Sequence, residues 1–269
     1  MELEPIIRLT KDLKEASRTL SRDEARYLVD AYYMMQRDRI RTNAQVRTQV
    51  DSGEPHAVLA WLSANTHMLE GQIRRALDAF SDADAVGRWS KGIVGIGPVI
   101  AAGLIAHIDI EKAPTVGHIW RFGGYDPTVC WEKKTARPWN ASLKTLFWKI
   151  GESFVKVSGH ERDVYGKLWL QRKAIEIARN HAGDFADQAR MALETKRYRA
   201  DTTAKKAYED GRLPDGHIHA RAKRWAVKLF LSHWHHVAYL SRFGIPPAKP
   251  YILTEHGGHA HQIMPPNWP

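Results

Sequence analysis

The segment from Gly92 to Pro98 reads Gly-Ile-Val-Gly-Ile-Gly-Pro and leaves the backbone few conformations. Glycine permits tight turns, and proline is favoured at the first position of a helix. The residues from Val99 to Ile108 are nearly all alanine, isoleucine, leucine, valine or glycine, which is typical of a closely packed, buried helix. The segment therefore predicts two helices joined by a tight turn that uses Gly95 and Gly97.

The same turn predicts a binding site for an anion. The first amides of a helix have no partner within it, so a helix N-terminus reached through glycines can hold a phosphate. We expect Gly95, Ile96, Gly97 and Pro98 to contact the phosphate backbone of DNA as a helix-hairpin-helix element, with Lys91 beside them. A plain turn between two core helices is the alternative.

Two long amphipathic helices are predicted before this segment. Ser21 and Glu24 have the spacing of a capping box, and apolar residues then recur at helical spacing to about residue 49. A turn at 51–55 and a second helix to about residue 80 follow. We expect residues 1–84 to form an antiparallel helical hairpin, which either packs on the rest of the chain or serves as a dimerisation arm.

Residues 85–240 are expected to form a helical domain with further positive charge. A helix breaks at Gly123-Gly124, and an exposed loop that is both basic and aromatic leads to a helix from about Asn140 to Val157. Tryptophans in such a loop either stack on bases or belong to the core. The DNA-contacting candidates of the loop and of this helix are Lys133, Lys134, Arg137, Lys144, Lys149 and Lys156.

The last third predicts more helices and a tail. A helical region over 162–200 is interrupted near Gly183, and the polar stretch 196–206 is expected to be a helix end or a linker. Asp215 is expected to cap a basic helix, and residues 241–269 read as an extended tail rich in proline and histidine. Arg221, Lys223 and Arg224 complete the DNA-contacting candidates. The fold class expected for the whole chain is all-α.

Composition narrows the function classes. A formal net charge of +10 and a pI of about 9.7 favour a polyanionic partner. The chain has neither an apolar run of about 18 residues nor the features of a signal peptide, which predicts a cytoplasmic protein that does not bind membranes. The single cysteine, Cys130, excludes an internal disulfide and a cysteine-based zinc site, and we expect it to be buried.

No cofactor or metal is expected. The histidines at 217, 219, 233, 235, 236, 256, 259 and 261 lack the spacing of a known zinc motif. We expect these histidines to serve in core packing, in helix capping or in contacts with nucleic acid, and not to bind a metal.

The residues from Gly92 to Asp109, followed by Trp120-Arg-Phe-Gly-Gly-Tyr-Asp-Pro127 and Leu143-Lys144, resemble a known family over about residues 85–180. This is the C-terminal domain of the insertion-sequence-110 transposases, which are related to the Piv site-specific DNA invertases. The long hairpin is similar to the helical arm that precedes that domain in the family. The resemblance implies DNA binding within a mobile element or phage, and by analogy a homodimer.

Two departures from the family bear on catalysis. No alternation of strands and helices bearing metal-binding acids precedes the hairpin, so the family's RNase-H-like domain is absent from this sequence. The family's nucleophilic serine is also missing, because Thr128, Val129 and Cys130 follow Pro127. Catalytic residues are therefore unknown. The alternatives to a DNA-binding protein are a minimal transposase or recombinase that needs a partner, with Cys130 as a conceivable nucleophile, and a protein that binds structured RNA, as the family does.

Overall fold

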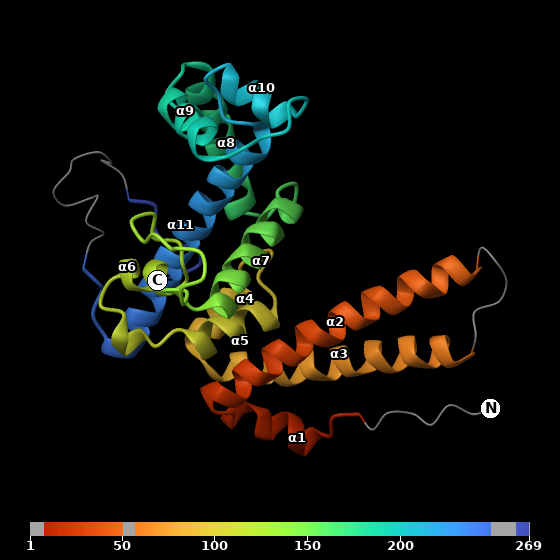
Figure 1. The fold of residues 1–269 in the computed structure, drawn as a ribbon. Helices are drawn as coiled ribbons and strands as arrows, with labels where there is room; N and C mark the ends of the chain where they lie inside the picture. Colours follow the sequence, from red (N-terminus) through yellow and green to blue (C-terminus); the bar gives the residue numbers. More distant parts are fainter. Residues whose placement is uncertain (1–7, 51–56, 249–261, 269) are drawn as a thin grey trace.

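The computed structural model describes residues 8–50, 57–248 and 262–268, and over these ranges the chain forms helices and no strands (Figure 1). The all-α prediction is confirmed. The α-helices are α1 (Lys11–Ala16), α2 (Arg22–Val50), α3 (Ala57–Ala83), α4 (Ala85–Lys91), α5 (Pro98–His107), α6 (Val116–Phe122), α7 (Ala141–Val157), α8 (Tyr165–His181), α9 (Ala186–Thr195), α10 (Thr203–Glu209) and α11 (Asp215–Phe243). Among them, none combines the length and the apolar character that crossing a membrane requires.

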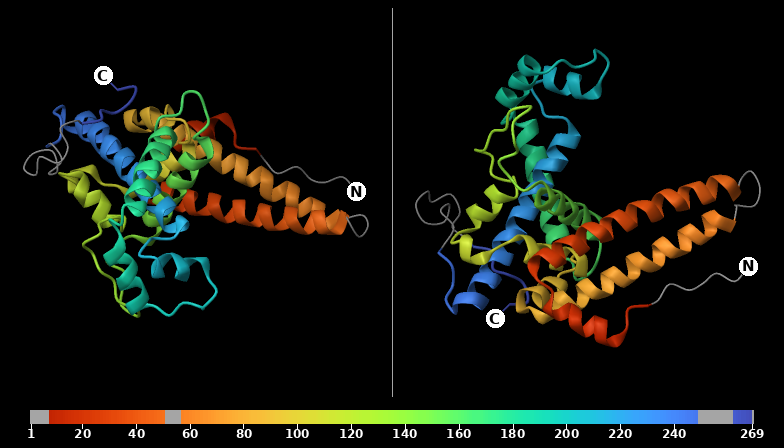
Figure 2. Two further views of the ribbon diagram at one scale, coloured as in Figure 1. Left: turned by 90° about the horizontal axis from the view of Figure 1, so that it is seen from above. Right: turned by 60° about the horizontal axis from the view of Figure 1, so that its bottom comes forward.

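Helices α2 and α3 lie antiparallel and project from the rest of the molecule as an arm (Figures 1 and 2). The predicted capping box starts α2: the Ser21 amide donates to Glu24 at 2.7 Å, and the Glu24 amide donates to Ser21 Oγ at 3.2 Å. An ion pair between Arg39 and Glu70, 2.5 Å long, ties the two helices together. The turn predicted at 51–55 lies outside the described residues.

The base of the arm belongs to the hydrophobic core. Ala25 and Val29 of α2 pack with Leu77 of α3 and with Val99 and Ala102 of α5. The arm is thus anchored on the helix that follows the glycine segment. The predicted boundary at residue 84 coincides with a cap, because the Asp84 side chain accepts a hydrogen bond from the Val86 amide at the start of α4.

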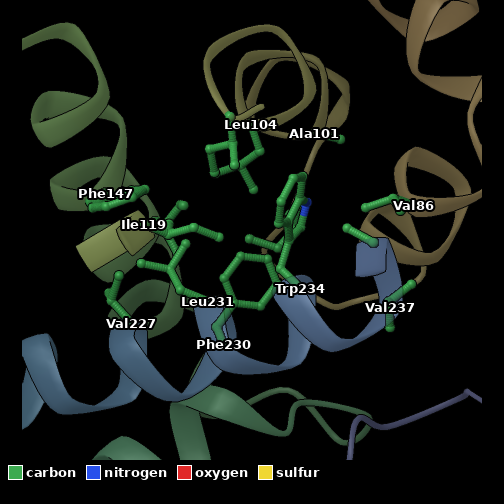
Figure 3. Close-up of a cluster of buried hydrophobic side chains, with 14 of the residues drawn as sticks. Val86, Ala101, Leu104, Ile119, Phe147, Val227, Phe230, Leu231, Trp234 and Val237 are labelled. Carbon is green, nitrogen blue, oxygen red and sulfur yellow. The ribbon is translucent and has the colours of Figure 1, made fainter. Parts of the chain in front are cut away.

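Side chains of α4, α5, α6 and α7 pack against those of α11 in the hydrophobic core (Figure 3), and Tyr165 of α8 belongs to the same cluster. Phe230 is fully buried and contacts the rings of Trp89, Phe154 and Tyr165. Such a residue fills a volume that no smaller side chain can fill without leaving a cavity. The core is therefore shared by segments far apart in the sequence, and it fixes the positions of α5 and α7.

Two expectations about the last third are wrong in detail. Asp215 does not cap α11: Pro214 is the N-cap residue, and no side chain makes the capping bond. Asp215 instead occupies the first turn, where its charge complements the helix dipole. The expected linker up to residue 206 is shorter, because α10 begins at Thr203. Helix α11 runs through residue 240 and ends at Phe243, before Gly244, whose φ is +72°.

Residues 262–268 of the tail lie against the helical domain. The Trp89 indole donates to the Pro266 carbonyl at 2.8 Å. His233, which is buried, makes hydrogen bonds of 2.7 Å to the Tyr165 hydroxyl and 2.8 Å to the Ile263 carbonyl. Burial lowers the pKa of His233 to about 4, so it is neutral at pH 7 and suited to this structural role.

Candidate nucleic-acid interface

Residues 92–97, here called the glycine corner, connect α4 to α5 as the sequence predicts. Gly95 has a φ of +95°, which favours glycine, and the Ser153 hydroxyl of α7 donates to its carbonyl at 2.5 Å. Gly97 is the N-cap residue of α5, and Pro98 takes the first helical position. No side chain caps α5. Gly97 is exposed, and a Cβ atom there would meet nothing within 4 Å, so the N-terminus of α5 is open.

Not every predicted residue of the glycine corner can donate to an anion. The Ile96 amide already donates to the Ile93 carbonyl at 3.0 Å, and the Ile96 side chain is buried. Pro98 has no amide hydrogen. The donors that remain for an anion are the backbone amides at the first turn of α5, reached past Gly97.

Lys91 is not available to a phosphate. Its ammonium pairs with Asp78 at 2.5 Å and with Asp82 at 2.6 Å, both on α3. Burial alone would lower the pKa of Lys91, but the hydrogen bonds that its ammonium donates to these two aspartates hold it above its ordinary value. Lys91 therefore joins α4 to the arm, and it is removed from the candidate interface.

Positive charge near the glycine corner comes from Lys149 and Lys156 of α7, and Arg37 of α2 lies close enough to Lys149 to affect its charge; these three residues are here called the corner cations. Lys149, Ser153 and Lys156 follow helical spacing, so the two lysines share the face of α7 that holds Gly95. The Lys149 ammonium lies 3.8 Å from the centre of the Tyr33 ring. Burial lowers the pKa of Lys149, and the nearby Arg37 and Lys156 lower it further.

The described residues place no carboxylate in an ion pair with any of the corner cations. Lys149 and Lys156 were predicted. Arg37 was not, because it reaches α7 only through the packing of the arm, and nothing in the local sequence of α2 signals this.

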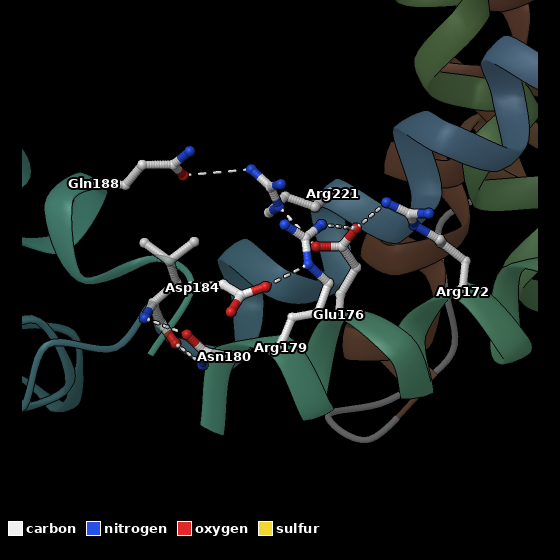
Figure 4. Close-up of polar contacts among 8 residues, drawn as sticks. Arg172, Glu176, Arg179, Asn180, Asp184, Gln188 and Arg221 are labelled. Carbon is white, nitrogen blue, oxygen red and sulfur yellow. Dashed lines mark hydrogen bonds and ion pairs between the residues drawn. The ribbon is translucent and has the colours of Figure 1, made fainter. Parts of the chain in front are cut away.

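Two further residues that were predicted to contact DNA, Arg221 and Lys223, instead form contacts within the protein. Arg221 donates to Glu176 at 3.1 Å and to Gln188 at 3.3 Å (Figure 4). Lys223 pairs with Glu152 of α7. Both side chains hold α11 to its neighbours, so neither belongs in the interface. Arg224, by contrast, is exposed.

Residues 123–140, here called the tryptophan loop, carry the remaining candidates. Lys133 and Lys134 belong to the exposed stretch 131–138. The Arg137 guanidinium lies 5.9 Å from the centre of the Trp131 ring, and the Lys144 ammonium lies 3.7 Å from that of Trp139. The loop thus pairs cations with indole rings.

Cys130 is exposed, so the expectation of a buried cysteine is wrong. The reason is its place on the tryptophan loop, which runs over the surface instead of through the core.

The histidines show no metal-binding arrangement in the part of the chain that the structure describes. His233 and His235 are buried and bonded to backbone carbonyls, the latter to Ala113 at 2.7 Å. His256, His259 and His261 lie outside the described residues. Comparison of the chain with protein-family models, with curated proteins and with solved structures finds no match.

Proposed function

We propose that this chain is a DNA-binding protein of a mobile element or phage, related to transposases, which grips the phosphate backbone of duplex DNA. One observation carries the proposal: the uncapped N-terminus of α5 follows a corner held by α7, whose Lys149 lies near Arg37 and Lys156, and the described residues pair none of these three cations with a carboxylate. The resemblance to the insertion-sequence-110 family and the net charge of +10 support it.

The electrostatics of the glycine corner favour a polyanion over a single small anion. Lys149 is partly buried between Tyr33 and two like charges, and this arrangement raises the free energy of its charged form. A phosphate near the corner would lower that free energy, while the α5 amides would hold its oxygens without reading a base. Consecutive phosphates along a strand would then meet Arg37 and Lys156.

The corner cations provide the direct test. Replacing Arg37, Lys149 and Lys156 by glutamine is expected to weaken binding of a blunt duplex about tenfold or more at fixed salt. The same change is expected to reduce the slope of log K against log salt by about 2 to 3. Fluorescence anisotropy titrations at several salt concentrations measure both quantities.

A variant of equal charge controls this experiment. Lys14, Lys112 and Arg190 are exposed and lie on other parts of the molecule, and their replacement by glutamine removes the same three charges. If both triple variants lose affinity equally, only net charge matters and the proposed interface is wrong. Tighter binding of a structured RNA hairpin than of the duplex would favour RNA as the natural ligand.

The arm supports the further proposal that the protein is a homodimer. Trp61, Leu62 and Leu69 of α3 are each at least 40% exposed, and residues 57–69 contain no lysine, arginine, aspartate or glutamate. An uncharged apolar face does not repel a second copy of itself, and a two-fold pairing of arms would bury it in both copies. Replacing Leu62 and Leu69 by glutamate is expected to convert a dimer into a monomer in light scattering. A wild-type protein that is already monomeric would contradict this proposal.

A further inference from the structure

The tryptophan loop is long and lacks regular secondary structure, yet it is held in place. At its base, the Asn140 amide donates to the Phe122 carbonyl at 2.8 Å, and the Asn140 side chain caps α7 through the Leu143 amide. Near its tip, the Trp131 indole donates to the Thr135 carbonyl at 3.0 Å. Loops of this length in a compact domain are commonly functional. Figure 1 shows the loop in yellow-green beside α11.

Two tryptophans of the loop pack against each other, and this pair is here called the aromatic step. Trp131 and Trp139 meet edge to face, with ring centres 6.4 Å apart. Trp139 is fixed against Gly124, where a Cβ atom would come within 2.8 Å of the indole. Trp131 is 41% exposed although its nitrogen is hydrogen-bonded. An oriented, exposed indole is poised to stack on a flat ligand.

Three cations lie around this step: Arg137, Lys144 and Arg224. Burial lowers the pKa of Lys144, and the neighbouring Arg137 and Arg224 lower it further. Within the described ranges, none of these three residues forms an ion pair with a carboxylate. Lys91 differs in this respect, because its aspartates hold its pKa above the ordinary value. Arg137 and Arg224 therefore disfavour the charged form of Lys144, and a bound anion would offset this effect.

We propose that the tryptophan loop binds unpaired nucleotides of a DNA strand. A base would stack on Trp131, and the adjoining phosphates would contact Arg137, Lys144 and Arg224. In a duplex the faces of the bases are covered by their neighbours, so an indole reaches them only on an unpaired strand. The exposed indole favours a flat base, and the cations favour the phosphates that accompany it on the same strand.

This site is separate from the glycine corner. Lys144 and Lys149 are five positions apart on α7, which places them about 140° apart around the helix axis. The proposal rests on the proposed function in one respect, since both assign nucleic acid as the ligand. The two sites nevertheless predict different substrates, duplex at the corner and unpaired strand at the loop, so each proposal fails independently of the other.

The test uses the full chain and a fluorescent oligothymidylate of about 15 nucleotides, a length that spans a typical single-strand site. Trp131→Ala is expected to weaken binding of this strand about 5- to 100-fold, the effect of losing one stacked base, and to leave duplex binding unchanged. Trp131→Phe keeps an aromatic face and is expected to restore most of the affinity. Trp148→Ala is the matched control, because Trp148 is exposed on α7 outside the loop.

Three results would overturn the proposal. The first is a wild-type protein that does not bind the oligothymidylate. The second is equal loss of affinity in Trp131→Ala and Trp148→Ala. The third is binding of the matching RNA strand about tenfold more tightly than the DNA strand, which would assign the loop to RNA. Thermal denaturation of each variant shows that it is folded, and loss of duplex binding in the corner-cation variant alone leaves the loop proposal intact.

Discussion

Replacing Gly97 by aspartate is expected to weaken duplex binding about 10- to 100-fold while leaving the fold as stable as before, or slightly more stable. Gly97 has a φ of −91° and a ψ of 174°, which any residue adopts, and a Cβ atom there meets nothing within 4 Å. Aspartate is among the best N-cap residues, so its carboxylate would accept hydrogen bonds from the first amides of α5. Those amides are the donors proposed for a phosphate, and the new charge would repel it.

Gly97→Asp is expected to weaken duplex binding without lowering the stability of the fold. A loss of affinity in this variant therefore cannot be attributed to unfolding. Anisotropy at fixed salt gives the affinity, and thermal denaturation gives the stability. Gly216→Asp is the matched control, because it adds the same charge in the first turn of α11, where a Cβ atom is also unobstructed. Unchanged affinity in Gly97→Asp would remove the glycine corner from the interface, whatever the control shows.

Local patterns predicted the elements of the fold because they depend on neighbouring residues. The capping box of Ser21 and Glu24, the helix start at Pro98 and the helix end at Gly123 each follow from chemistry within a few positions. The alanine-rich sequence after Pro98 likewise predicted a buried helix, since such residues permit close packing. These features need no knowledge of the tertiary fold.

The sequence could not predict in the same way which cations are free to bind a phosphate and which are paired with a carboxylate. Lys91 is neutralised by Asp78, which is 13 residues away, and Lys223 is neutralised by Glu152, which is 71 residues away. Neither pair follows helical spacing along one element. Arg37 became a candidate for the same reason, because the packing of the arm brings it near Lys149. A basic residue can therefore be assigned to an interface only when the carboxylates that lie next to it in the fold are known.

The sequence predicts an exposed loop, which the structure confirms, but it does not predict the exposure of Cys130 within that loop. A lone cysteine is most often buried, and tryptophans are most often core residues. Cys130 and Trp131 are both exposed because the loop is closed at its base by the Asn140 amide and the Phe122 carbonyl, which holds the intervening residues on the surface. The double glycine before the loop was the available signal, since it ends α6 and allows Trp139 to pack on Gly124.

The buried carboxylate of Glu176 gives the second large effect. Glu176 is 2% exposed and is surrounded by Arg172, Arg179 and Arg221, with Arg221 donating at 3.1 Å (Figure 4). Glu176→Gln is expected to lower the free energy of unfolding at pH 7 by about 2 to 4 kcal/mol, because it leaves three arginines without their shared counter-charge. The arginines are partly exposed, and solvent screening keeps the effect below that of a fully buried pair.

The dependence of this loss on pH identifies its cause. Burial alone would raise the pKa of Glu176, but hydrogen bonds from Arg221 and Arg172 hold it below the ordinary value of 4.5. A carboxylate with a lowered pKa stabilises the folded state fully above its unfolded pKa, and this contribution is lost as the pH falls through the folded pKa. Urea denaturation should therefore show that the free energies of unfolding of the wild type and of Glu176→Gln differ strongly at pH 7 and converge well below pH 4.5.

Glu194→Gln provides the control, because Glu194 is exposed and forms no ion pair in the described part of the chain. A difference between wild type and Glu176→Gln that persisted undiminished into acid would show that packing, and not charge, makes Glu176 important.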